Sequence, residues 1–242
     1  MNQPLSYDVV EARHRQREEA TSMSTIVIQD NVVIPAWVGD LATFRRWAQS
    51  EAFPEHGWVS YLGGEIWVDL SMEQLFSHNQ VKTRFAVVLA GLVDAQRLGY
   101  FFGDRALLSN PRANLSTEPD GIFVSYAAIE TGRLTFLAGA ESGFTELEGT
   151  PDMVLEVLSP TSVRKDTVKL RDLYWQAGIP EYWLVDAGRP TASLNILHWS
   201  ADGYVAADPM EGWLQSAVFN RQFQLTQQTD PLGHPQYLLA VR

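Results

Sequence analysis

The segment that constrains the fold most runs from Pro151 to Asp186 and reads PDMVLEVLSPTSVRKDTVKLRDLYWQAGIPEYWLVD. It contains an apolar run, a stretch with helical periodicity, a Gly-Ile-Pro stop and a second apolar run. This order predicts a strand, a helix and a strand, and two strands joined in this way are usually parallel neighbours with a right-handed crossover. The segment therefore predicts a partly parallel sheet with a helix on one face.

Further strands and helices are predicted on both sides of this unit. They are a short strand pair or an extended arm at 25–35, a helix at 39–53 with Asp40 as N-cap, a hairpin at 57–70 that turns at Gly63-Gly64, a helix from about Met72 to Leu98 that ends at Gly99, strands at 100–109 and 119–126, a weakly patterned connection at 127–150, and a hairpin at 193–207. The whole order predicts an α/β fold in which helices flank a mixed sheet, with extra β-hairpins.

Composition narrows the class of protein. The 242 residues include no cysteine, which excludes disulfides and thiolate metal sites and is compatible with a cytoplasmic protein. The start of the chain is polar, and no apolar run is long enough to cross a bilayer. The net charge of −11 argues against a protein that coats nucleic acid by bulk electrostatics, although an enzyme could still engage nucleic acid through a local groove.

Glu156 is a charged residue within an otherwise apolar predicted strand. It interrupts the apolar run VLEVL, on the same strand face as Val154 and Leu158. A carboxylate inside a sheet is costly unless a cation, a hydrogen-bond network or protonation neutralises it. Asp120 follows Pro119 and opens another predicted strand, so two carboxylates could meet on neighbouring strands. Such oxygen ligands suit Mg²⁺ or Mn²⁺, which can support hydrolysis of a phosphoester.

The helix that follows Glu156 supplies a candidate cation. At 100° per residue its predicted buried stripe is formed by apolar positions from Val163 to Ala177, and Asp166 falls within this stripe. Lys169 falls on the edge of the stripe. A lysine there can bury its stem and bring its ammonium towards the end of the sheet. It could then orient the attacking water or neutralise a phosphate oxygen.

These motifs resemble the Uma-two (Uma2) family of restriction endonucleases, within the PD-(D/E)XK nuclease superfamily. The likeness is carried by Pro119-Asp120, Pro151-Asp152, the run EVLSP from Glu156, then Asp166, Lys169, Tyr174, Gly178, EYW from Glu181, and Asp186. Gly64-Glu65 and His78 match weakly upstream. The resemblance covers roughly residues 40–190 and is densest at 151–186.

The resemblance implies a restriction endonuclease-like fold and a set of site residues. Asp120 and Glu156 would be metal ligands, with the backbone carbonyl of Val157 as a possible third. The superfamily places a lysine two residues after the glutamate, where this chain has Leu158. The resemblance makes Lys169 the candidate for a lysine that has moved to the next helix. Glu65, His78 and Asp166 are possible accessory residues.

Each of these residues also has a structural interpretation. Asp120 could cap a turn, and Glu156 could pair with Lys169 or Arg164. Lys169 could be a solvated helix lysine. Glu65 could be a turn residue and His78 a helix-capping imidazole, and Asp152 is better explained as a strand start than as a ligand.

We therefore expect residues 1–35 to be a tail or arm and residues 36–242 to form a single restriction endonuclease-like domain with a core at about 40–190. The expected activity is Mg²⁺- or Mn²⁺-dependent endonuclease cleavage of DNA, with Asp120, Glu156 and Lys169 at the site and a possible homodimer. Two alternatives are a non-catalytic nuclease-fold module for binding or assembly, which Leu158 and the net charge favour, and a metal-dependent hydrolase of small phosphoesters.

Overall fold

The structure of the protein is a computed structural model that describes residues 26–28, 32–139 and 143–242. The chain divides into two units, Met1–Gly39 and Asp40–Arg242. In the first unit, β1 (Ile26–Ile28) and β2 (Val32–Ile34) pair antiparallel, which is the strand pair of the two predicted alternatives. The tail expected at 1–24 lies outside the described residues. All elements discussed below belong to the second unit.

A central sheet of six strands carries the strand-helix-strand unit. Its order is β14-β13-β12-β11-β8-β5, and β11 and β12 are parallel while all other neighbours are antiparallel. The strands are β5 (Gly99–Phe102), β8 (Gly121–Ser125), β11 (Met153–Val157), β12 (Glu181–Asp186), β13 (Ser193–Ser200) and β14 (Gly203–Ala206). All five residues of β11 are buried, which agrees with its near-continuous apolar sequence.

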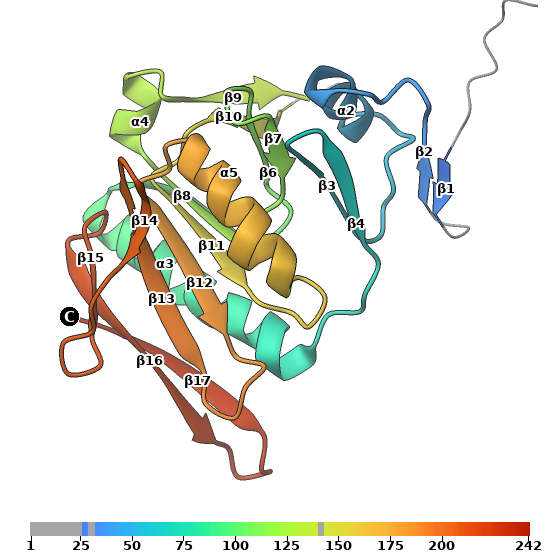
Figure 1. The fold of residues 1–242 in the computed structure, drawn as a ribbon. Helices are drawn as coiled ribbons and strands as arrows, with labels where there is room; N and C mark the ends of the chain where they lie inside the picture. The colour runs from blue at the N-terminus through green and yellow to red at the C-terminus, as the bar shows by residue number, and fades with distance from the viewer. Residues whose placement is uncertain (1–25, 29–31, 140–142) are drawn as a thin grey trace, which may run out of the picture. The chain divides into compact units, whose positions relative to one another are not determined.

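Helices cover both faces of this sheet (Figure 1). The connection from β11 to β12 forms a π-helical turn η2 (Lys165–Leu170) that continues into α5 (Arg171–Gln176). Its side chains Leu170, Leu173 and Tyr174 pack in one core cluster with Val154 of β11. On the other face, the π-helical turn η1 (Leu75–Gln80) leads into α3 (Val81–Gln96), whose Phe85 and other apolar side chains join the cluster that contains the odd-numbered residues of β11.

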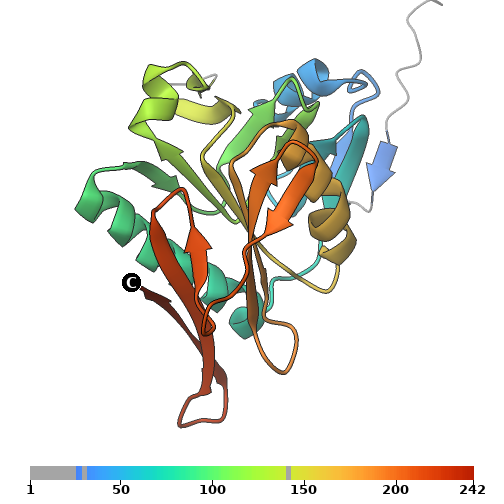
Figure 2. The ribbon, with the colours of Figure 1, turned by 60° about the vertical axis from the view of Figure 1, so that its left-hand side comes forward.

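Two further sheets and two short helices complete the unit. The second six-stranded sheet has the order β4-β3-β7-β6-β10-β9, formed by β3 (Trp58–Leu62), β4 (Glu65–Asp69), β6 (Leu107–Asn110), β7 (Leu115–Thr117), β9 (Leu134–Ala138) and β10 (Phe144–Gly149). A three-stranded sheet, formed by β15 (Leu214–Ser216), β16 (Arg221–Thr229) and β17 (Pro235–Val241), shares the core cluster of α3 (Figure 2). The short helices are α2 (Leu41–Ala48) and α4 (Tyr126–Glu130).

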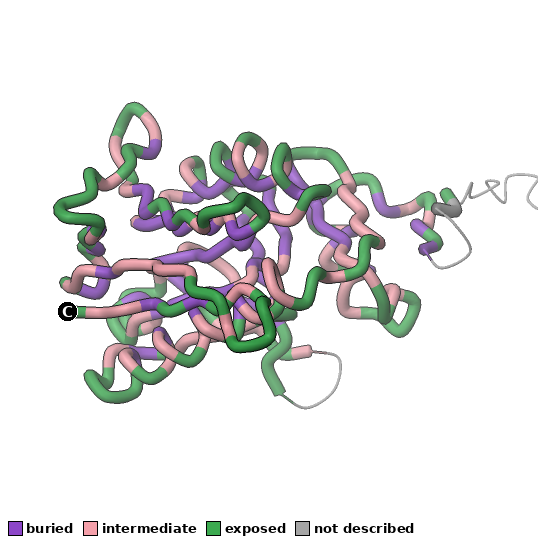
Figure 3. Tube along the Cα trace, turned by 90° about the horizontal axis from the view of Figure 1, so that it is seen from below, coloured by how far each residue is buried: buried purple, intermediate pink, exposed green. Residues whose placement is uncertain are grey.

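Burial follows these layers. Buried segments run along the central strands, and exposed segments lie mainly in the connections at the periphery (Figure 3). Within the described residues, no helix is long and apolar enough to span a membrane.

Most of the predicted elements are present. The predicted hairpins correspond to β3–β4 and β13–β14, and Asp40 caps α2 by accepting a hydrogen bond from the Thr43 N–H at 2.8 Å. The parallel pairing of β11 and β12 and the helical stop at Gly178, which has φ +73°, are also confirmed.

Three local predictions are wrong. The long helix ends at Arg97, a left-handed residue with φ 53°, while Gly99 already belongs to β5. The connection predicted at 127–150 contains most of α4 together with β9 and β10, which its weak periodicity did not reveal. Val163, predicted to be buried in the helix stripe, is 46% exposed because the π-helical turn that follows it changes the angular step of the helix.

Candidate active site

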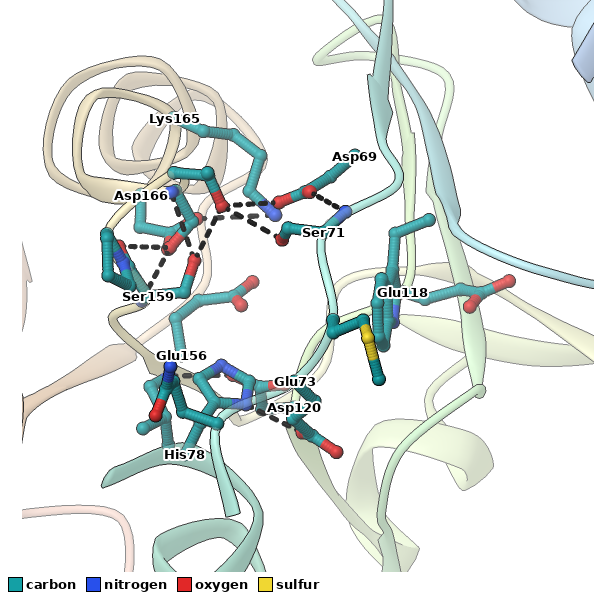
Figure 4. Close-up of a pocket in the computed structure, with 17 residues that line it drawn as sticks. Asp69, Ser71, Glu73, His78, Glu118, Asp120, Glu156, Ser159, Lys165 and Asp166 are labelled. Carbon is teal, nitrogen blue, oxygen red and sulfur yellow. Dashed lines mark hydrogen bonds and ion pairs between the residues drawn. The ribbon is translucent and has the colours of Figure 1, made fainter. Parts of the chain in front are cut away.

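A pocket of about 220 Å³ lies at the carboxyl end of β11 (Figure 4). Glu156 and Val157 come from the end of β11, and Asp120 comes from the residue before β8. Lys165 and Asp166 come from η2, and His78 comes from η1. Six of the lining residues are acidic: Asp69, Glu73, Glu118, Asp120, Glu156 and Asp166. We call this cavity the acidic pocket.

Glu156 is one of the two buried carboxylates nearest the strand ends, the other being Asp166. Its residue is 3% exposed, and its Oε1 accepts a hydrogen bond from the Tyr174 hydroxyl at 2.6 Å. Burial raises the pKa of Glu156 well above its ordinary value, and the charges of Asp166 and Asp120 raise it further, while Lys165 opposes the rise. Glu156 therefore holds a proton at pH values where an exposed glutamate is ionised, unless a cation takes the place of that proton.

Asp120 is tied to Glu156 through the backbone. Its Oδ2 accepts a hydrogen bond from the Val157 N–H at 2.7 Å, because β8 and β11 pair antiparallel with Gly121 opposite Leu155. The Nε2 atom of His78 lies 3.7 Å from Oδ2, and the ammonium of Lys82 lies 3.7 Å from Oδ1. Burial raises the pKa of Asp120, and the charges of His78 and Lys82 oppose the rise.

Lys165 and Asp166 face the two strand carboxylates from η2. Asp166 is 1% exposed, and its Oδ1 lies 3.4 Å from the Lys165 ammonium. Burial raises the pKa of Asp166, and Lys165 opposes this effect. Burial alone would lower the pKa of Lys165, but the negative charges of Asp166, Glu156 and Asp120 raise it above its ordinary value. Lys165 therefore stays a cation and a hydrogen-bond donor at neutral pH.

A second polar group closes the pocket behind Asp120. His78 Nδ1 lies 2.7 Å from the Glu73 Oε1 atom, and the buried ammonium of Lys82 contacts the same carboxylate. Burial would raise the pKa of Glu73, but hydrogen bonds from Lys82, Asn79 and His78 lower it to about 2. Glu73 thus fixes one edge of the His78 ring and leaves Nε2 directed towards Asp120.

The structure brings together only part of the predicted set. Asp120, Glu156, Val157, Asp166 and His78 all line the acidic pocket.

Lys169 and Glu65 do not line this pocket; instead they pair with each other, with 3.1 Å between the Lys169 Nζ and Glu65 Oε2 atoms. The Glu65 side chain is 61% exposed, so this pair lies at the surface. Among the described residues that line the pocket, the lysine is Lys165, four residues earlier, which pairs with Asp166.

Sequence reasoning missed Lys165, Glu73, Lys82 and Asp69 as neighbours of the site. Lys165 had a usable signal, since it directly precedes the buried Asp166, but a regular α-helix would turn it away from the buried stripe. The other three had no such signal, because the segments that carry them approach β11 only in the folded chain. For Asp152 the structural interpretation is favoured: it contacts the Arg133 guanidinium and accepts a hydrogen bond from the Ser125 N–H at 2.6 Å.

The donor set fits a hard divalent cation. Across the described part of the chain, no three His, Asp or Glu side chains are arranged to enclose a metal ion. Magnesium, however, commonly takes one or two protein carboxylates and keeps several waters. Three buried side-chain oxygens of the described residues lack a hydrogen-bond partner, and two of them, Glu118 Oε2 and Asp166 Oδ1, belong to pocket residues. A pocket with this excess of carboxylate oxygen is suited to a cation.

Comparisons with known proteins identify the family and the fold of the chain. The family model described as "Uma2: Putative restriction endonuclease" matches residues 41–228, which is most of the chain. No curated protein matches the chain. A solved structure that resembles it is described as "a putative nuclease belonging to DUF820 from Anabaena variabilis ATCC 29413". The two chains are 18% identical with a TM-score of 0.55, and the likeness covers 75% of this chain and 90% of the other. The family and the fold support a nuclease, and the chain belongs to the Uma2 family of restriction endonuclease-like proteins.

Proposed function

We propose that the protein is a metal-dependent endonuclease that hydrolyses phosphodiester bonds in DNA. The observation that carries this proposal is the meeting of two buried carboxylates, Glu156 and Asp166, and the half-buried Asp120 with one ammonium, Lys165, in one pocket at the end of β11. Carboxylates alone would repel a phosphodiester, so the pocket needs a cation before it can receive one. A homodimer, expected from the two-fold symmetry of duplex DNA, stays a prediction.

Asp120 and Glu156 are the proposed ligands of Mg²⁺ or Mn²⁺, with the Val157 carbonyl as a possible third. When bound, the cation would supply Lewis-acid stabilisation of the charge that develops on the phosphoryl group. The protein orients the two carboxylates from behind: the Val157 N–H donates to Asp120, and the Tyr174 hydroxyl donates to Glu156. Each carboxylate keeps one oxygen that makes no short hydrogen bond to these groups, and that oxygen is the one offered to a cation.

Lys165 takes the role that the sequence assigned to Lys169. Because neighbouring carboxylates raise its pKa, Lys165 acts as a cation rather than as a base. Its ammonium can donate hydrogen bonds to a non-bridging phosphate oxygen or hold the attacking water. Lys169 already pairs with Glu65 at 3.1 Å and lies outside the lining of the pocket. The two lysines therefore make a matched pair for a test.

The test is a cleavage assay of plasmid and single-stranded DNA with Mg²⁺, with Mn²⁺ and with a chelator. We expect cleavage with either metal and none with the chelator. Lys165→Met is expected to lower the rate by about 100-fold, as for loss of a donor to developing charge. Lys169→Met, the matched control, should stay within about threefold of the unmodified protein. No cleavage of any DNA with either metal would refute the nuclease proposal, and equal loss in both lysine variants would refute the role of Lys165.

The small size of the acidic pocket favours a second candidate, hydrolysis of small phosphoesters. A cavity of about 220 Å³ is below the usual range for a drug-sized ligand, roughly 300–1,000 Å³. Bis(p-nitrophenyl) phosphate serves as the small phosphodiester in the same assay. A much higher kcat/KM for this compound than for any DNA would favour the second candidate.

A further inference from the structure

A second cavity of about 260 Å³ adjoins the acidic pocket. It lies between the β3–β4 hairpin and the start of the helix after β11. Its lining residues are Trp58, Ser60, Trp67, Val68, Asp69, Thr161, Ser162 and Lys165. Five of them, Trp58, Asp69, Thr161, Ser162 and Lys165, also line the acidic pocket, so the two cavities share a wall. We call the second cavity the tryptophan slot.

The slot offers aromatic surface rather than free polar groups. Trp67 lines the slot and is half-buried; its ring also packs against the core cluster that contains Tyr174, and its indole N–H donates to Glu65 Oε2 at 3.1 Å. Trp58 is also half-buried, and its ring is held near two cations, with the Arg105 guanidinium carbon 5.5 Å and the Lys82 ammonium 5.9 Å from the ring centroid. Because these cations lie over the Trp58 ring, Trp67 is the indole of the slot that is left to stack on a flat aromatic group.

The polar groups at the shared wall are arranged around Lys165. Figure 4 shows the Lys165 side chain reaching from the helix towards Asp69. Asp69 is the one carboxylate among the described residues that line the slot, and its oxygens already accept hydrogen bonds from the Ser71 N–H at 2.8 Å and the Thr161 hydroxyl at 2.9 Å. Lys165 therefore lines both cavities, and its ammonium is a charged hydrogen-bond donor at the wall that the slot shares with the acidic pocket.

We infer that the tryptophan slot holds the base of one unpaired nucleotide whose phosphate lies beside Lys165 in the acidic pocket. This inference rests on the proposed function and narrows its substrate to strands that are locally single-stranded, such as ends, flaps or unpaired loops. A stacked base pair is too large for a cavity of about 260 Å³. One nucleotide fits the arrangement, because its base can stack on an indole in the slot while its phosphate meets the Lys165 ammonium beside the carboxylates. Stacking on indole also explains how a chain of net charge −11 could retain a nucleic acid.

The test measures binding separately from cleavage. The protein keeps its proposed metal ligands, and the probe is fluorescein-labelled tetrathymidylate with phosphorothioate linkages, which resist hydrolysis, with Mn²⁺ present. Trp67→Leu, which keeps an apolar side chain but removes the ring, is expected to raise Kd by about 5- to 150-fold, the usual effect of one lost base stack. Trp67→Phe, which keeps a ring, should raise it by less than about fivefold. Fluorescence anisotropy reports both values.

The matched control is Trp199→Ala. Trp199 is 45% exposed and lines neither cavity, so its loss should leave Kd within about twofold. A second probe, a blunt duplex long enough to stay paired and with the same linkages, should bind more weakly and with no dependence on Trp67. Circular dichroism of each variant identifies any that fails to fold, and the comparison of Trp67→Leu with Trp67→Phe then uses folded proteins only.

The outcomes separate this inference from the nuclease proposal. Tight binding that depends on Trp67, with no cleavage by the unmodified protein, would support base binding in the tryptophan slot and refute the proposed nuclease activity. Cleavage of DNA, with equal Kd values for Trp67→Leu and Trp67→Phe, would support the nuclease activity and refute base binding in the tryptophan slot. Equal binding of duplex and single strand, or no measurable binding of the single strand, would also overturn the slot.

Discussion

Two buried glutamates on neighbouring strands of the central sheet show how differently one fold can treat the same side chain. Glu156 on β11 is 3% exposed and Glu181 on β12 is 1% exposed. The parallel register pairs Met153 with Glu181 and Glu156 with Leu184, so the two carboxylates lie at opposite ends of the strand pair. The structure surrounds one with hydrogen-bond donors and the other with carboxylates.

Glu181 accepts hydrogen bonds from four donors, three of them from the C-terminal segment. Its Oε1 accepts from the N–H groups of Ala217 and Val218 at 2.5 and 3.1 Å, and its Oε2 accepts from the Ser216 hydroxyl at 2.7 Å and the Trp183 indole at 2.9 Å. Among the described residues, the donor to Glu156 is the Tyr174 hydroxyl. Glu181 therefore joins the three-stranded sheet to the central sheet, whereas Glu156 has oxygen left for a ligand. The number of donors, not burial, separates a structural carboxylate from a candidate ligand.

The largest expected effect is on activity at Glu156. Glu156→Gln keeps the shape of the side chain and the hydrogen bond from Tyr174 but removes a proposed metal ligand, so the rate of DNA cleavage should fall by about 1,000-fold or more. Glu181→Gln is the matched control and should retain its rate within about threefold once folded. Comparable loss in both variants would remove the functional distinction between the two glutamates.

The next effect is on stability at Glu181. Glu181→Ala leaves four donors near the C-terminal sheet without their acceptor, and we expect the free energy of unfolding to fall by about 3 kcal/mol. Urea denaturation followed by circular dichroism measures it. A loss below about 1 kcal/mol would mean that water or another group satisfies these donors, and Glu181 would then not be the link between the sheets.

Stabilisation by metal should distinguish Glu156 from Glu181, with an effect on the free energy of unfolding similar in size to that of Glu181→Ala. A ligand at 100 times its Kd stabilises the folded state by about 2.7 kcal/mol, so Mn²⁺ should raise the melting temperature of the unmodified protein. Glu156→Gln should lose this shift and Glu181→Gln should keep it. Because the cation takes the place of a proton on Glu156, the shift should also grow as the pH rises. An undiminished shift in Glu156→Gln would place the metal elsewhere.

The smallest expected effect is a pH-dependent gain in stability without metal. Burial raises the pKa of Glu156 in the folded state, so the folded protein binds the extra proton and loses stability as the pH rises from the ordinary glutamate pKa through the raised one. Glu156→Gln does not titrate. With a chelator, it should match the unmodified protein near pH 4 and exceed it by about 1 kcal/mol above the raised pKa. If the difference in the free energy of unfolding between Glu156→Gln and the unmodified protein shrinks as the pH rises, burial does not raise the pKa of Glu156.

Local patterns were enough to predict much of the frame of the site. An apolar run, a periodic stretch and a Gly-Ile-Pro stop predicted the parallel pair β11–β12, since period and punctuation are local properties. Alternation placed Glu156 on the face of Val154, and both lie on the side of α5, because successive side chains of a strand alternate. The residues of β9 and β10 escaped prediction because their short strands are defined by partners far along the chain.

The sequence by itself determined the strand-helix-strand unit, the buried carboxylate on its first strand and the acidic residue that opens β8. Only the tertiary structure decided which lysine accompanies them. A regular helix turns 100° per residue and points Lys169 towards the sheet, but η2 is a π-helical turn closed by i→i+5 hydrogen bonds, so each residue advances by a smaller angle. The smaller step exposes Val163, brings Lys165 to the carboxylates and leaves Lys169 with Glu65, and it depends on how the helix packs against the sheet.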